Sequence, residues 1–459
     1  MKAIIAATLL GIILMFAGLA TKDKRSIASI AVVGFLLLLG VNIWELATTS
    51  PSEPQVLFNN MLRIDRYGLW FNLLMTACTL LYVMLVNKDI QRVGMHVAEY
   101  FALIAFILCG VYLLSSYNNV LMLFIGIEII SIPQYILAGS DKRNLKSSEA
   151  SLKYFLMGSF STGILLMGIV LLYGATGTFN IVEYTFLQSD SLNPLALSGI
   201  LFLMVALSFK VSAVPMHMWT PDVYDGSPTP FTAFMATIVK AAAFLAFMRL
   251  FSVSFGSLSD HWMMILAIIT AATLFVGNIT AVFQQSVKRM LAYSSIAQAG
   301  FMLFAIIAVN ATAWQGMILY AVAYSVATIG MFSVLLKLKD YTYDGFNGLA
   351  KKNPALAFFT TIFLLSLAGI PLTGGFMAKY FVLMAAVKQG NLLWLVIFAL
   401  LMAAISAYYY FRVIIAMYFK QGEPEFSSEV TGTDKLLMAI TCALVILIGC
   451  VPQLVLANI

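Results

Sequence analysis

Residues 207–230 of this 459-residue chain read LSFKVSAVPMHMWTPDVYDGSPTP. Lys210 stands at the end of a long apolar run, and Pro215 follows it five residues later. Because proline removes a backbone donor and clashes with the preceding turn, a helix that enters this stretch is expected to kink or break. The stretch therefore predicts a charged amine beside a break in an apolar helix.

The composition of the chain places this helix in a membrane. Hydrophobic residues make up 62% of the chain and charged residues only 10%, with a mean hydropathy of +0.96. So few charges cannot cover a soluble surface. Continuous strand alternation is absent, so helices are the expected way to satisfy the backbone in lipid.

Fourteen apolar runs are long enough to cross roughly 30 Å of hydrocarbon at about 1.5 Å per residue. The predicted spans are 3–20, 26–46, 67–86, 97–115, 119–138, 151–174, 194–217, 229–252, 262–283, 288–308, 313–337, 355–387, 391–419 and 434–456. The predicted fold is an all-α polytopic membrane protein with about 14 transmembrane helices.

The distribution of basic residues predicts the topology. If the N-terminus faces outward, the inward loops hold seventeen lysines and arginines and the outward segments hold five. This asymmetry predicts a cytoplasmic membrane with both termini on the outer face. The net charge of +6 lies in these short loops, so a nucleic-acid partner is excluded.

A second interruption matches the first. Residues 366–376 read SLAGIPLTGGF around Pro371, within a run too long for one simple span. The breaks near Pro215 and Pro371 fall five spans apart, and a repeated unit of five helices must reverse its orientation. The pattern predicts two inverted five-helix repeats, each with a broken helix, as in transporters whose ion sites lie near the membrane midplane. The predicted units are 1–96 (helices 1–3), 97–252 (first repeat), 262–420 (second repeat) and 434–459 (helix 14).

Four charged residues lie deepest in the apolar runs: Glu128, Lys210, Lys240 and Lys379. A charge at the bilayer centre costs at least about 2.5–3.5 kcal/mol on insertion scales, so each requires a physical reason. Amines and carboxyls can gain and lose protons, and burial favours their neutral forms. We therefore predict a proton path along these residues, in which Glu128 biases the charge of Lys210.

Simpler interpretations compete at each position. Buried ion pairs can merely fix helix register, and Lys379 can extend along its helix toward the interface. His217 can relay protons beside Lys210 or be a neutral, hydrogen-bonded histidine. The four cysteines lie in apolar runs without a CxxC motif, which predicts small buried side chains and no metal site.

Three motifs carry a family resemblance. They are HMWTPDVYDGSPTPFTAF (217–234), VKRMLAYSSIAQAGFML (287–303) and SLAGIPLTGGFMAKYFVL (366–383). With the stretch 146–177, they make the chain resemble the subunit N family of bacterial NADH:quinone oxidoreductase (respiratory complex I). The antiporter-like subunits M and L and the Mrp cation/proton antiporters share the architecture but differ in the first motif.

The resemblance implies a fourteen-helix proton-translocating subunit without a redox cofactor of its own. Flavin, iron–sulfur clusters and quinone would belong to partner subunits. The family's glutamate of helix five falls on Glu128, and its lysines of helices seven, eight and twelve fall on Lys210, Lys240 and Lys379. Implied partners are subunit M and small helical subunits in a bacterial inner membrane. One departure from the family is Pro133, which would alter the position of Glu128 by kinking its helix.

The expected function is proton translocation from the cytoplasm to Lys210, then Lys240, then out past Lys379. One alternative is an Mrp-type antiporter that exchanges sodium for protons. Another is a structural membrane subunit, in which Lys210 would be dispensable for pumping.

Overall fold

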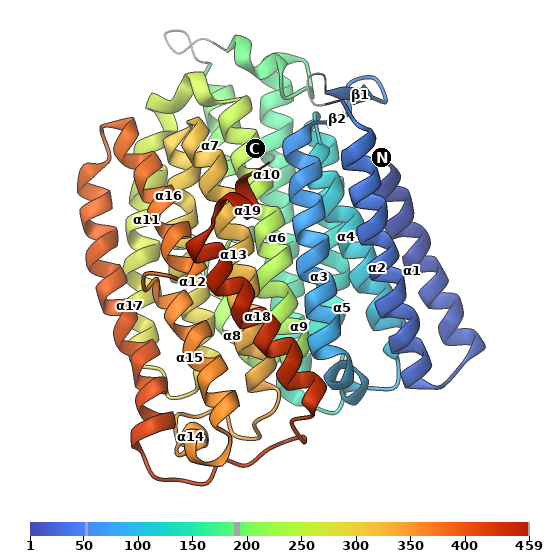
Figure 1. Ribbon diagram of the computed structural model, residues 1–459. Helices are drawn as coiled ribbons and strands as arrows, with labels where there is room; N and C mark the ends of the chain where they lie inside the picture. The colour runs from blue at the N-terminus through green and yellow to red at the C-terminus, as the bar shows by residue number, and fades with distance from the viewer. Residues whose placement is uncertain (51–53, 188–192, 458–459) are drawn as a thin grey trace.

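The computed structural model describes residues 1–50, 54–187 and 193–457. It is a bundle of long helices with both termini toward the same end (Figure 1). The first three long helices are α1 (Lys2–Ala20), α2 (Lys24–Thr48) and α3 (Arg66–Val93). A two-stranded antiparallel hairpin, β1 (Gln55–Leu57) and β2 (Leu62–Ile64), joins α2 to α3.

The remaining helices follow in the order of the predicted runs. The first group contains α4 (Val97–Ser116), α5 (Val120–Ala138), α6 (Leu145–Thr176), α7 (Pro194–Lys210), α8 (Trp219–Gly226), α9 (Thr229–Phe234), the π-helical segment η3 (Met235–Val239) and α10 (Lys240–Val253). The second contains α11 (Ser259–Val282), α12 (Val287–Ala308), α13 (Ala311–Leu335), α14 (Leu349–Lys352), α15 (Pro354–Ala368), α16 (Gly374–Gln389), α17 (Leu393–Phe419), α18 (Gly432–Cys450) and α19 (Gln453–Leu456).

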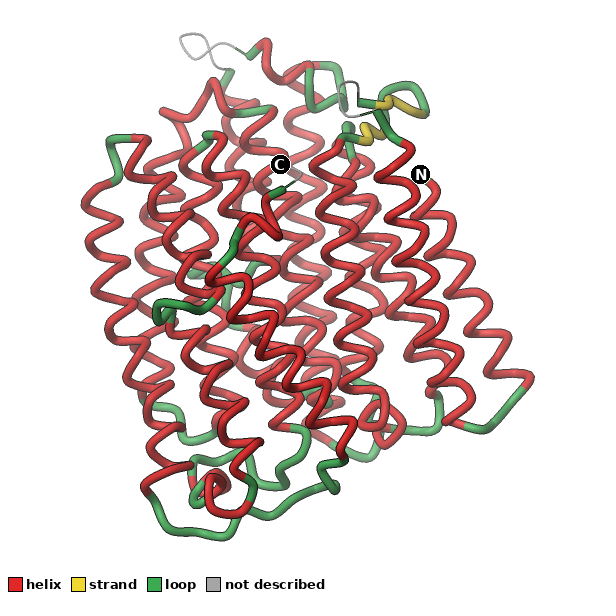
Figure 2. Tube along the Cα trace, in the orientation of Figure 1, coloured by secondary structure: helices red, strands yellow, loops and turns green. Residues whose placement is uncertain are grey.

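Twelve helices in the described part of the chain are long and apolar enough to cross a membrane, and α7 and α15 are shorter apolar helices. Each predicted run thus contains a helix, but the predicted span 194–217 is not one continuous helix. The helix α7 ends at Lys210, and turns follow it up to α8. The predicted span 355–387 is likewise divided, between α15 and α16. Non-helical segments interrupt the bundle between its two ends (Figure 2). The inverted repeats and their boundaries remain predictions, and the predicted ranges 1–96, 97–252 and 434–459 include residues outside the described part.

Polar caps set where the apolar helices begin. Asparagine side chains accept from backbone N–H groups at the starts of α5, α6, α7, α13 and α15. Such caps satisfy donors that a helix start leaves free. Pro133 lies inside α5, which continues through it from Val120 to Ala138, and the expected kink stays a prediction.

The centre of the bundle is formed by α10, α12 and α13. The most apolar stretch of α13 is entirely buried, and those of α12 and of the α9–α10 segment are almost so. By contrast, at most about a third of the most apolar stretch of α1, α2 and α6 is buried, as expected for lipid-facing helices. Three cysteines are buried as predicted, but Cys450, at the end of α18, is exposed.

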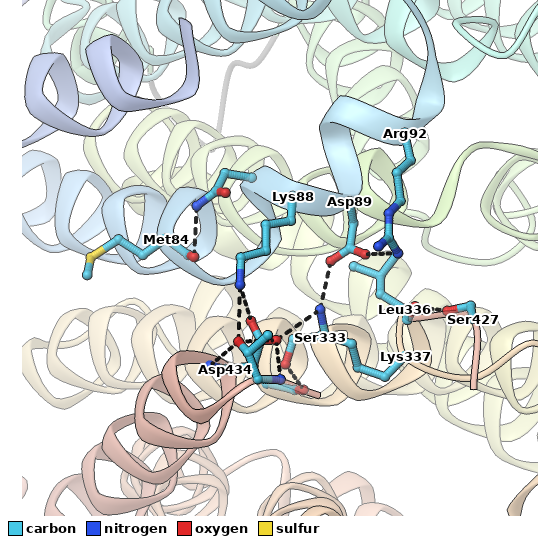
Figure 3. Close-up of polar contacts among 12 residues, drawn as sticks. Met84, Lys88, Asp89, Arg92, Ser333, Leu336, Lys337, Ser427 and Asp434 are labelled. Atoms are coloured by element: carbon cyan, nitrogen blue, oxygen red, sulfur yellow. Dashed lines mark hydrogen bonds and ion pairs between the residues drawn. The ribbon is translucent and has the colours of Figure 1, made fainter. Parts of the chain in front are cut away.

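A buried ion cluster ties α18 to the rest of the bundle (Figure 3). The Nζ atom of Lys337 lies 3.2 Å from Oδ2 of Asp89 on α3 and 3.8 Å from Oδ2 of Asp434 on α18. All three side chains are nearly inaccessible. Asp434 also closes a capping box with Thr431 at the start of α18. One lysine therefore joins three segments that are distant in the sequence.

Replacing Lys337 with methionine is expected to lower the free energy of unfolding by about 3–5 kcal/mol, because it leaves two buried carboxylates without their shared cation. Thermal unfolding of the purified protein in detergent measures the change. Lys339→Met is the matched control, since its ion pair with Glu425 is well exposed, and it should cost less than about 1 kcal/mol. Equal losses in the two variants would contradict a stabilising role for the cluster.

Candidate functional site

Lys210 is the last residue of α7, at the predicted break. The chain then leaves the helix through Ser212, whose backbone is left-handed (φ 66°), and through Pro215. A cation at a helix C-terminus is favoured by the helix dipole and by the free carbonyl groups. The Nζ atom of Lys210 donates to the hydroxyl of Ser131 on α5, at 3.0 Å. The break thus places this amine inside the bundle, half-buried against α5.

Glu128 lies three residues before Ser131 on α5, but it does not form a contact ion pair with Lys210. Its carboxylate accepts instead from the hydroxyl of Thr162 on α6, at 2.8 Å. The two charges are still close enough to interact electrostatically. The predicted pair is therefore separated, with Ser131 binding the amine and Thr162 binding the carboxylate.

A small cavity lies beside Lys210 and extends toward the helix that carries Lys240. Its volume is about 30 Å³, and its lining includes Ser131, Lys210, Val239 and Ala243. A cavity needs roughly 10–15 Å³ for a single water molecule, together with polar partners. Water bound to Lys210 would thus lie between α7 and α10.

Lys240 is 2% exposed and directly follows the π-helical segment η3. A π-helical turn is rare and often occurs at functional sites. The Nζ atom of Lys240 donates to the carbonyl (3.0 Å) and hydroxyl (2.6 Å) oxygens of Ser295 on α12. Within the described residues, the buried amine therefore hydrogen-bonds to neutral oxygens and forms no ion pair.

Lys379 is held at the second break. Gly369, with φ 86°, ends α15 and leaves carbonyl groups of its last turn free. Lys379, in the second turn of α16, donates to the carbonyl oxygens of Leu367 (3.1 Å) and Ala368 (2.8 Å). A Cβ atom on Gly369 would lie 2.9 Å from Lys379 Cδ, so only glycine leaves room for this amine. Lys379 is thus buried and does not extend to the interface.

Polar side chains on α12 lie between the second and third lysines, although no hydrogen bond between described residues joins Ser295 to Gln298. Gln298 lies one turn after Ser295 and donates to the carbonyl of Leu367 at 2.8 Å, which also binds Lys379. The same amide donates to the hydroxyl of Tyr410 and accepts from the hydroxyl of Tyr320. Sequence reasoning missed these residues. The signal that could have indicated them is the pair Ser294 and Ser295, followed three residues later by Gln298, within the apolar run 288–308.

His217 lies between the break and α8. It is buried, and its Nδ1 atom has no hydrogen-bond partner within the described residues. No hydrogen bond or ion pair between described residues joins it to Lys210, so its role as a relay remains a prediction.

A charged cavity of about 210 Å³ opens where α6, α8 and α12 meet, with Lys153, Asp222 and Arg289 in its lining. Asp222 pairs with Lys153 at 2.8 Å and with Arg289 at 3.1 Å. Partial burial favours neutral Asp222, but the hydrogen bond and charge of Lys153, with Arg289, hold the pKa of Asp222 below its ordinary value. Lys288 is buried at this end of α12 and donates to the carbonyl groups of Asp225 and Ser227.

Comparison with known proteins identifies the architecture around these residues. The family described as "NADH:quinone oxidoreductase/Mrp antiporter, TM" matches residues 117–406, which include all four predicted charges. NADH-quinone oxidoreductase subunit N of Cytophaga hutchinsonii is 41% identical over 463 residues, covering 99% of each chain. The chain belongs to the subunit N family of NADH-quinone oxidoreductase.

Solved structures agree with membership of the subunit N family. A chain of respiratory complex I from Thermus thermophilus superposes with a TM-score of 0.84 and 30% identity, covering 99% of this chain and 98% of that one. A chain of the Mrp complex from Dietzia sp. has a TM-score of 0.85, 100% and 96% coverage and 18% identity, and shows the shared fold alone. The chain is thus a multi-pass membrane subunit that works with other membrane subunits. Across the described residues, no cluster of three or more histidine, cysteine or acidic side chains could hold a metal ion.

Proposed function

We propose that this chain translocates protons as a subunit of NADH-quinone oxidoreductase, driven by electron transfer in other subunits. Three lysines carry the proton: Lys210, Lys240 and Lys379, here called the lysine relay. The observation that carries the proposal is the bonding of these amines. Each lies inside the bundle and donates to neutral hydroxyl or carbonyl oxygens.

Such bonding suits a group that changes its charge. An amine fixed permanently as a cation in a membrane is normally paired with a carboxylate, because an unpaired buried charge is costly. Hydroxyl and carbonyl oxygens can accept from an ammonium, and an amine can donate to the same atoms after it loses its proton. Either protonation state of the relay therefore keeps hydrogen bonds.

The route begins at the charged cavity and enters near Lys210, where the 30 Å³ cavity gives room for water. From Lys240 the path follows Ser295 and Gln298 along α12 to the carbonyl of Leu367. Lys379 then releases the proton toward the opposite face. His217 lies beside the entry and is the secondary candidate for a relay group.

Glu128 sets the charge of Lys210 in this mechanism. Its carboxylate stabilises the protonated amine without touching it, so a small movement of α5 relative to α7 changes that stabilisation. Since α5 exposes Ile125, Ile132 and Ile136, a neighbouring membrane subunit packed there is a means of transmitting such movement. We propose subunit M and small helical subunits as neighbours, in a bacterial inner membrane with both termini on the periplasmic side.

Glu128→Gln tests this arrangement, because glutamine retains an acceptor for Thr162 but removes the charge. Proton translocation should fall by about tenfold or more, since a charge several ångströms away in a poorly solvated site contributes about 1.4 kcal/mol or more. NADH-driven proton uptake by proteoliposomes that contain the purified complex measures this. Glu425→Gln, at an exposed carboxylate in the α17–α18 loop, is the matched control and should translocate normally. Full activity of Glu128→Gln would contradict the proposed role.

The Mrp-type antiporter is the second candidate, favoured by the shared fold. It predicts sodium/proton exchange by the chain alone in liposomes, with no NADH and no partner subunits. The proposal predicts instead that transport requires the assembled complex and an electron donor. Sodium-dependent exchange by the isolated chain would overturn it.

A further inference from the structure

A basic groove lies between α2 and α3, far from the lysine relay. Its volume is about 760 Å³, within the roughly 300–1,000 Å³ of typical ligand sites. Four basic residues line it and no acidic residue does: Lys24, Arg25, Lys88 and Arg92. The start of α2 and the end of α3, which carry these residues, lie at the end of the bundle opposite the N-terminus (Figure 1).

The positions of these basic groups are fixed by the fold. Lys24 donates to the carbonyl groups of Gln91 and Gly94, each at 2.7 Å, and so joins the start of α2 to the end of α3. Lys88 lies 3.6 Å from Asp434 and Arg92 lies 3.7 Å from Asp89, at the edge of the buried cluster (Figure 3). Both acids also pair with Lys337. About half of the side chains of Lys88 and Arg92 remains exposed to the groove.

The deeper wall of the groove is apolar. Ala28, Val32 and Val33 follow the basic residues along α2. Val33 is 57% exposed, and Leu36 and Leu37 continue this exposed surface in the next turn. Along α2, the basic residues at the membrane surface are thus followed by exposed apolar residues within the thickness of the bilayer.

We propose that this groove binds an anionic phospholipid, with the headgroup phosphate between α2 and α3 and the acyl chains along Val33, Leu36 and Leu37. Basic pockets between transmembrane helices bind anionic headgroups. A free phosphate ion would contact only the basic residues of the groove. A phospholipid would contact the basic residues with its headgroup and the apolar wall with its acyl chains. The bound lipid would cover α2, most of whose apolar surface is exposed, and is a ligand distinct from the translocated proton.

Lipid retention by the complex purified through this chain tests the site. Native mass spectrometry compares phosphatidylglycerol with phosphatidylcholine, each titrated into the detergent. Wild type should prefer phosphatidylglycerol, and Arg25→Gln/Lys88→Gln should bind it roughly thirtyfold more weakly, since each basic residue contributes to attraction at the surface. Lys142→Gln/Arg143→Gln removes the same two charge types from the exposed α5–α6 loop and should bind as wild type does.

A second variant separates lipid binding from loss of fold. Ser29→Trp fills the groove at an exposed position without altering a charge, and should also lose phosphatidylglycerol. Unchanged retention in both groove variants would overturn the proposal, as would equal retention of the two lipids by wild type. Displacement of the lipid by inorganic phosphate would indicate a free-anion site instead. A photocrosslinker at position 29 that captures a neighbouring subunit, and not lipid, would overturn it in favour of a protein interface.

Discussion

Replacing Lys210 with arginine is expected to reduce proton translocation through this chain by about a hundredfold, the order contributed by a proton-transferring side chain. Arginine retains the positive charge but does not release its proton in proteins. It would therefore block a relay that needs deprotonation, even where the guanidinium still binds Ser131. The measurement is NADH-driven proton uptake per NADH oxidised, in proteoliposomes that contain the purified complex.

Lys210→Met should show the same loss, because it removes the proton carrier while keeping an unbranched side chain. Lys142→Met, in the exposed α5–α6 loop, is the control for loss of a basic residue. The Lys210→Arg variant decides between two roles. Normal translocation with arginine would mean that Lys210 acts as a fixed charge and carries no proton.

Replacing Lys379 with methionine is expected to have a similarly large effect, about a hundredfold. The amine is the group that binds the free carbonyls of Leu367 and Ala368 at the second break. Without it, protons on Lys240 have no acceptor on the far side of Gln298. The assay is again proton uptake per NADH, with complex content checked by native electrophoresis so that failed assembly is recognised.

The control for Lys379 lies on the same helix. Lys388, at the end of α16, is exposed and donates to the hydroxyl of Thr312. Lys388→Met should translocate protons normally. If Lys379→Met assembles and translocates like Lys388→Met, the exit of the relay lies elsewhere.

The sequence predicted the fold wherever a single physical cost dominated. Fourteen apolar runs predicted the helices, because hydrocarbon leaves no other way to satisfy the backbone, and Pro215 and Pro371 predicted the two breaks. The same cost identified Lys210, Lys240 and Lys379 as residues that need a partner. The kink expected at Pro133 stays a prediction: α5 is continuous through this residue, and the bend of a helix at proline depends on packing that the sequence does not contain.

The partners of these charges could not be predicted, because they depend on tertiary distances. The sequence predicted that Glu128 biases the charge of Lys210, but it did not indicate that Ser131 and Thr162 bind the two groups separately. Nothing in the spacing of Gln298 indicates that its amide meets the carbonyl of Leu367 across the bundle. The basic groove could not be predicted for the same reason, since Arg25 and Lys88 lie on different helices.

The central claim is that the three lysines conduct in series, and a double variant tests it most directly. Groups that act as one unit show strongly non-additive effects, whereas independent groups give losses that multiply. Proton uptake per NADH is measured for Lys210→Met, for Lys379→Met and for the two combined. The account predicts that the double variant is within about twofold of the slower single variant. Losses that multiply to about ten-thousandfold, as two independent hundredfold effects would, would contradict a single relay.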